Sequence, residues 1–94
     1  MKKKQEEISG VLLDWSMSYL ESGRFIEAVF ALEETTRLNP GDPLAWAALA
    51  MAAALSGDRE KARRYFLELK ARNPNGKYVN RVLPFLGHVS NDEI

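Results

Sequence analysis

The sequence predicts an all-α protein, built as a stack of antiparallel helix hairpins with about five helices. Apolar residues recur at steps of three and four, which is the spacing of one face of an α-helix. Gly, Asn and Pro separate these apolar segments at intervals. Short segments also recur after 34 residues, which indicates a repeated structural unit.

The repeat is visible in the segments that end the helices. Asn39-Pro40 recurs as Asn73-Pro74, and Ser22-Gly23 recurs as Ser56-Gly57. The pairs Met17/Met51, Ala28/Ala62 and Glu34/Glu68 have the same offset. We therefore expect a single domain over residues 1–94, with repeat one at 9–42, repeat two at 43–76, and a capping helix and tail at 77–94.

The first helix carries two apolar stripes. They comprise Ile8, Leu12, Trp15 and Tyr19 on one side, and Leu13, Met17 and Leu20 on the other. Such a helix is covered on both sides or lines a groove. Position alone predicts that Trp15 and Trp46 are core aromatics. Ser22-Gly23 ends the helix, because Gly readily adopts the left-handed conformation of a helix C-terminus.

A second helix is predicted over residues 24–38, with an inward face of Phe25, Ala28, Val29 and Leu32. Pro in Asn39-Pro40-Gly41 then breaks the helical pattern. The third helix has Asp42 as its N-cap and Pro43 at its first position. Residues 44–55 are Ala-rich and almost wholly apolar, so we expect the buried central helix here.

The fourth helix, over residues 59–72, follows a stop at Gly57 and a cap at Asp58. Its solvent face has the pairs Glu60/Arg64, Arg64/Glu68 and Glu68/Arg72 at spacing four, and its inner face has Ala62, Phe66 and Leu69. A fifth helix over residues 77–83, which Pro84 ends or kinks, should cover the last apolar surface of the stack. Both Lys2–Lys4 and residues 87–94 are expected to be frayed ends.

The length and composition of the chain exclude several classes of function. The chain has 94 residues, 13 basic and 13 acidic side chains, and no cysteine. This excludes a two-domain enzyme, a disulfide framework and thiol catalysis, and it disfavours binding to nucleic acid or an anionic membrane. There is no signal peptide and no apolar stretch long enough for a membrane helix, so a cytoplasmic protein is expected.

No residue constellation points to catalysis, a cofactor or a small-molecule substrate. His88 stands alone, without a second ligand at metal-binding spacing. Asp14 and Glu21 share one helix face, but no nucleophile or deep pocket accompanies them. The basic residues of the fourth helix, beside Tyr65 and Phe66, are interrupted by acids and give only a weak indication of nucleic-acid binding.

The 34-residue unit resembles the tetratricopeptide repeat family, whose pattern is W-x2-L-G-x2-Y, then A-x3-F, then P. Repeat two matches at Trp46, Leu49, Ala50, Gly57, Asp58, Ala62, Phe66 and Pro74. Repeat one matches at Leu12, Trp15, Ser16, Tyr19, Gly23, Phe25, Ala28, Leu32 and Pro40. The departures at Arg24, Thr35, Ala53, Arg59 and Leu69 weaken single contacts.

The resemblance implies a non-catalytic protein-interaction module with a concave groove, lined by the first helix of each pair. The groove residues that it implies are Leu13, Asp14, Met17, Leu20, Glu21, Leu44, Ala47, Ala48, Met51 and Leu55. They lack the Lys and Asn that members of the family use to clamp the carboxylates of chaperone tails. An apolar peptide or helix of a partner protein is therefore expected, in an adaptor or chaperone-like role. Alternatively, Met17 and Met51 are plain core, and Tyr78 and Val82 of the closing helix fill the groove.

Ile26 and Phe30 suggest a second function. They lie four residues apart on the outer face of the second helix, where repeat two has Glu60 and Arg64. Exposed apolar pairs mark partner contacts, so a scaffold that forms a homo-oligomer through this pair is the alternative hypothesis. Otherwise the N-terminal segment covers the pair, or the pair is an ordinary scattered surface feature.

Overall fold

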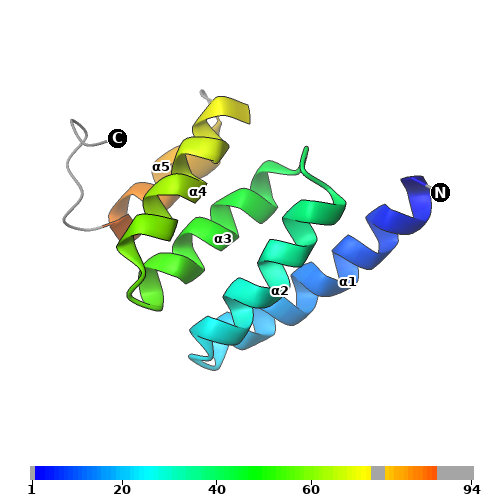
Figure 1. The fold of residues 1–94 in the computed structure, drawn as a ribbon, viewed down its shortest axis with the longest axis horizontal. Helices are drawn as coiled ribbons and strands as arrows, with labels where there is room; N and C mark the ends of the chain where they lie inside the picture. The colour runs from blue at the N-terminus through cyan, green and yellow to red at the C-terminus, as the bar shows by residue number, and fades with distance from the viewer. Residues whose placement is uncertain (1, 73–75, 87–94) are drawn as a thin grey trace.

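Five α-helices follow one another in the computed structural model, which describes residues 2–72 and 76–86. The helices are α1 Lys2–Glu21, α2 Phe25–Leu38, α3 Pro43–Leu55, α4 Arg59–Arg72 and α5 Lys77–Leu86 (Figure 1). The described residues contain no β-strand. The predicted all-α stack of helix hairpins is confirmed.

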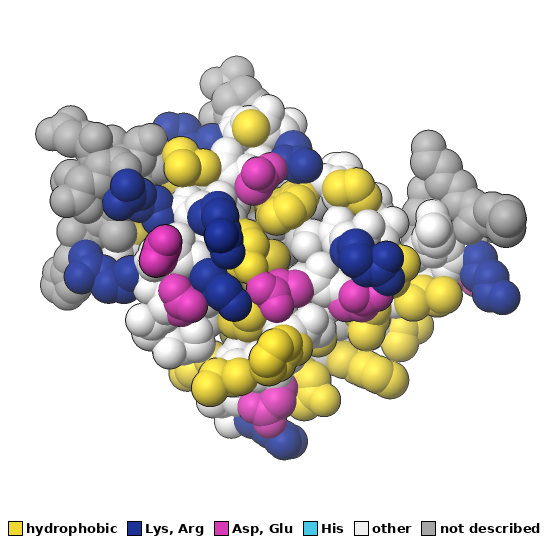
Figure 2. All heavy atoms as spheres, viewed as in Figure 1, with side chains coloured by type: hydrophobic (Ala, Val, Ile, Leu, Met, Phe, Trp, Pro, Cys, Tyr) yellow, Lys and Arg dark blue, Asp and Glu magenta, His cyan; other side chains and the backbone are white. Residues whose placement is uncertain are grey.

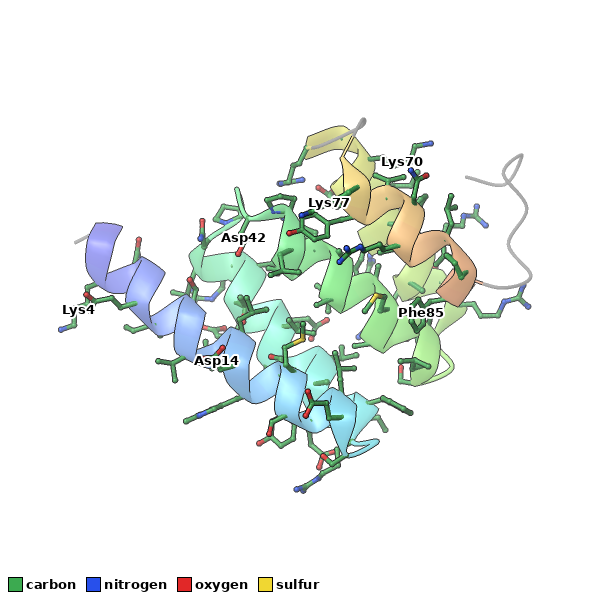
Figure 3. The ribbon with its side chains drawn as sticks, turned by 180° about the vertical axis from the view of Figure 1, so that it is seen from behind. Lys4, Asp14, Asp42, Lys70, Lys77 and Phe85 are labelled. Atoms are coloured by element: carbon green, nitrogen blue, oxygen red, sulfur yellow. The ribbon has the colours of Figure 1, made fainter. Side chains whose placement is uncertain are left out.

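The helices form two hairpins and a closing helix. α1 packs against α2 and α3 against α4, while α5 packs on α3 and α4. α3 is the centre of the fold, because it contacts each of the other four helices. Seen from behind, α1, α3 and α5 lie on the near side (Figure 3). α5 therefore closes the stack as the sequence predicts.

The helices begin and end at the capping and helix-ending residues that the sequence predicts. Gly23 and Gly57 have φ angles of 78° and 90°, which lie in the left-handed region that side chains disfavour. Asp42 Oδ1 accepts a hydrogen bond of 3.0 Å from the Leu44 N–H, and Asp58 Oδ1 accepts one of 3.1 Å from the Lys61 N–H. Both predicted N-caps are confirmed.

The core is built around the small side chains of α3. Seven of its 13 residues are buried, and six of those seven are Ala, so neighbouring helices can approach its backbone closely. The largest fully buried apolar side chains come from the surrounding helices and from α3 itself: Phe66, Leu32, Leu49, Leu69 and Val82. Burial of this apolar surface is the main favourable contribution to folding.

Two predicted helix boundaries are wrong. α1 begins at Lys2, since Lys, Gln and Glu in the first turns are good helix formers. α5 continues through Pro84 to Leu86. Pro84 cannot donate to the carbonyl of Asn80, but both residues are exposed, so water can satisfy that carbonyl.

The prediction that Trp15 is a core aromatic is also wrong, because its exposed fraction is 58%. Its counterpart in repeat two, Leu49, is fully buried in the core that α2 and α3 share. No described helix precedes α1 to cover Trp15 in the same way. Trp46 is half-buried and packs at the edge of the core.

One of the three predicted ion pairs of α4 forms within the described residues, between Arg72 and Glu68.

Candidate functional site

Three helices, α1, α3 and α5, lie on one side of the molecule (Figure 3). α1 and α5 both pack against α3, and within residues 2–72 and 76–86 no Cα atom of α1 lies within 8 Å of a Cα atom of α5. On the side seen in Figure 3, α3 lies between α1 and α5, and we refer to α3 as the floor and to α1 and α5 as the walls of the predicted groove. The sequence predicts that α1 and α3 line the groove, whereas it offers α5 as the helix that would fill the groove in the alternative interpretation.

The α1 wall is apolar with an acidic rim. Leu13, Met17 and Leu20 are half-buried and pack against the core, so each presents part of its side chain to solvent. Asp14 and Glu21 are exposed on the same helix, and Figure 3 shows Asp14 on this side of the molecule. The wall thus offers apolar contact below a negatively charged edge.

The floor consists mainly of small side chains. Ala47 and Ala48 have exposed fractions of only 3% and 1%, so they define the depth of the floor and offer little surface. Met51 and Leu44 are half-buried. Leu55 is 43% exposed at the end of α3, where it lines a hollow with the turn between α1 and α2.

Some apolar side chains of the α5 wall are buried against the core, and others are exposed. Val82 is fully buried and Tyr78 is half-buried against the core. The closing helix therefore packs part of its apolar face onto the stack. Phe85 is 44% exposed, and in Figure 3 it lies on the side of the molecule where α1, α3 and α5 are seen.

Phe85 was missed because the predicted helix ended at Leu83. Its signal is the repeat itself, since Met17, Met51 and Phe85 are each 34 residues apart. A third apolar side chain therefore occupies the same register position on the third helix of this layer.

Ile26 and Phe30 form a separate apolar patch on α2. Their exposed fractions are 63% and 66%, so the N-terminal segment, which is part of α1, does not cover them. They line a hollow of about 120 Å³ together with one residue from each of α2, α3 and α4 and two residues of the turn between α3 and α4. These are Val29, Ala53, Lys61, Ser56 and Asp58. Hydrophobic side chains on this side of the molecule gather over α1 and the start of α2, whereas charged ones dominate over α4 (Figure 2).

No feature of the described chain suggests metal or membrane chemistry. Residues 2–72 and 76–86 contain no group of three His, Cys, Asp or Glu that could hold a metal ion. None of the five helices is both long enough and apolar enough to span a bilayer. His88, to which the sequence assigns no role, lies outside the described residues.

The family assignment follows from comparison with known protein families. The tetratricopeptide repeat model matches residues 19–83, which is more than half of the chain and includes the end of α1, all of α2, α3 and α4, and most of α5. No curated protein and no solved structure is significantly similar to the chain. The match agrees with the 34-residue helix hairpins, the left-handed Gly at each hairpin turn and the closing helix. This chain belongs to the tetratricopeptide repeat family.

Proposed function

We propose that the protein is a non-catalytic interaction module that binds an apolar peptide or helix of a partner protein between α1 and α5. The partner segment would lie on α3 and contact Met17, Met51 and Phe85. The role would be that of an adaptor or a chaperone-like protein in the cytoplasm, without a cofactor, nucleic acid or small-molecule substrate. Membership of a family of protein-interaction modules supports the general class of function.

One observation carries the proposal. α1 and α5 both pack against α3 with no Cα atoms within 8 Å of each other, and each presents apolar side chains that are only partly buried. A segment placed between them would bury this surface, at about 25 cal/mol per Å² of apolar area removed from water. Flexible Met side chains would let the groove adapt to partners of different shape.

Binding of selected peptides tests the proposal. Apolar peptides are selected by display on the immobilised protein, and their affinities are measured by fluorescence anisotropy. Phe85→Glu and Met51→Glu should each weaken binding about tenfold or more, because a carboxylate would be desolvated in the complex. Phe85 is exposed, so its replacement should leave the fold intact, and circular dichroism checks the half-buried Met51.

Phe30→Glu is the matched control, since Phe30 is equally apolar but lies on α2, away from the groove. Peptides that bind this variant and wild type equally well, but lose affinity with Phe85→Glu, support the groove. Peptides that lose affinity only with Phe30→Glu would bind elsewhere and contradict the proposal.

A second candidate function is self-association through Ile26 and Phe30, in a scaffold that forms a homo-oligomer. The exposure of both side chains beside a 120 Å³ hollow favours it. If Ile26 and Phe30 are the surface that drives self-association, Phe30→Glu should convert a concentrated sample to monomer without changing peptide binding. An unchanged molecular mass of this variant in light scattering would argue against this surface.

A further inference from the structure

A third apolar surface lies on α1, on the side away from the groove. Ile8, Val11 and Trp15 are 44%, 49% and 58% exposed. Their spacing of three and four residues places them on one side of the helix. They form an exposed stripe, here called the α1 stripe, whose middle is at Val11 and Leu12.

In the second repeat, the face of α3 that corresponds to the α1 stripe is buried against another helix. The residues 34 positions after Val11 and Trp15 are Ala45 and Leu49 on α3, and both are fully buried. α2 packs against α3, and Leu49 shares a core cluster with Leu32 of α2. The corresponding face of a first helix therefore accepts another helix, whereas on α1 no described helix occupies it.

α5, at the opposite end of the stack, is not suited to cover the α1 stripe of a second copy. α5 closes this end, and its exposed residues include Lys77, Asn80 and Arg81. Covering the α1 stripe with this polar surface would desolvate charged groups without pairing them. Head-to-tail stacking of copies is therefore disfavoured relative to a contact between two identical α1 stripes.

We propose that the α1 stripe binds the α1 stripe of a second copy, with the two helices antiparallel about a two-fold axis. Such an interface must be self-complementary. With the axis between Val11 and Leu12, Ile8 of each copy faces Trp15 of the other, so the small and large ends of the stripe are matched. The two Val11 side chains lie next to the axis.

The charges at the ends of α1 agree with this orientation. The first turn of α1 contains no acidic residue, and Lys4 is exposed nearby, although the positive end of a helix dipole favours acids. In the antiparallel pair, each Lys4 lies towards the C-terminal end of the other α1, where the negative end of the dipole attracts a cation. Parallel packing would instead bring the two basic ends together.

The interface is small, so the dimer should be weak. α1 has 20 residues and is about 30 Å long, and one apolar stripe of a helix buries less than the roughly 800 Å² per partner of a standard interface. We expect a monomer–dimer equilibrium that shifts within the micromolar to millimolar concentration range.

Sedimentation equilibrium across a concentration series tests the proposal. Wild type should approach twice the monomer mass, and Trp15→Glu and Val11→Glu should remain monomeric. Phe30→Glu and Phe85→Glu should dimerise like wild type, which separates this surface from the other two. Because Trp15 and Val11 are exposed, these variants should fold, and their helicity is compared with wild type by circular dichroism.

A cysteine placed near the axis tests the orientation, since the chain has no native cysteine. Val11→Cys should form a covalent dimer on mild oxidation. Ser18→Cys should not, because two copies of an exposed residue seven positions from Val11 would be about 20 Å apart along antiparallel helices.

Three results would overturn the proposal: a wild type that stays monomeric at the highest concentration, a dimer that survives Trp15→Glu but not Phe30→Glu, or cross-linking through Ser18→Cys in preference to Val11→Cys. Peptide binding by the groove is measured separately, so the failure of one proposal leaves the other standing.

Discussion

At the scale of single residues, the carbonyl oxygen of Pro40 joins the two hairpins. It accepts hydrogen bonds of 2.8 Å from both Trp46 Nε1 and Arg72 Nε. The Arg72 guanidinium also lies 4.6 Å from the centre of the Trp46 ring, at cation–π distance. The turn between α2 and α3 is thus tied to the start of α3 and to the end of α4. Trp46 therefore contributes through its indole N–H as well as through apolar burial.

Replacement of glycine by alanine should have opposite effects on the free energy of unfolding at two positions, Gly10 and Gly57. Gly10 lies within α1, and a Cβ added there would meet no atom within 4 Å. Gly10→Ala should raise the free energy of unfolding by about 0.5–1 kcal/mol, because Ala is the better helix former. Gly57→Ala should lower it by about 1–2 kcal/mol, since its φ of 90° strains any side-chain-bearing residue. Urea denaturation of both variants measures the difference, and a loss of stability in Gly10→Ala would contradict the expected open space.

The structural role of a residue could be predicted from the sequence where that role depends only on nearby residues. The caps at Asp42 and Asp58 and the left-handed Gly23 and Gly57 depend on neighbours within a few positions, so the sequence predicts them directly. Trp15 depends instead on whether another helix packs beside α1. Because no local pattern carries that information, its exposure could not be predicted.

At the scale of elements, α2 and α4 are linked by polar side chains. Glu33 on α2 accepts a hydrogen bond from the Tyr65 hydroxyl of α4, and Lys61 Nζ lies 3.6 Å from a Glu33 carboxylate oxygen. Burial, followed by the hydrogen bond to Glu33, raises the pKa of Tyr65 above its usual value of 10.0. The neutral hydroxyl is therefore favoured in the folded state.

This pKa shift predicts a loss of stability in alkali. Folded Tyr65 holds its proton more tightly than unfolded Tyr65, so its contribution is complete below about pH 10 and is lost as the pH rises through the raised pKa. Tyr65→Phe should cost about 1 kcal/mol at neutral pH, where the hydrogen bond is intact. The difference from wild type should shrink above pH 10, as followed by urea denaturation at several pH values. A difference that stays constant with pH would show that Tyr65 does not titrate in this way.

The order of the helices could be predicted, but the extent of the terminal ones could not. The internal helices end at Gly, Asn and Pro, and these helix-ending residues can be recognised in the sequence. α5 passes through Pro84 because the freed carbonyl faces water, and that depends on which side of α5 packs inward. The same missing information hid Phe85, although its distance from Met51 equals the repeat length.

At the scale of the whole molecule, stability should decrease from α3 outward. α3 contacts every other helix, and its buried alanines are enclosed by them. α1 has 20 residues whereas α2 has 14, so the start of α1 extends past its partner helix (Figure 1). The start of α1 has few contacts with the rest of the fold, so opening of the helix should begin at this end.

Amide hydrogen exchange should resolve this gradient helix by helix. The amides of α3 should exchange slowest, at rates set by global unfolding, because α3 cannot open without separating both hairpins and α5. The first two turns of α1 should exchange fastest among the described helices at dilute concentration. Raising the concentration should slow exchange along α1 in wild type but not in Trp15→Glu, since only a dimer through the α1 stripe would cover that helix. Equal exchange rates in α3 and at the start of α1 would contradict the central role of α3 and indicate that the five helices open as one unit.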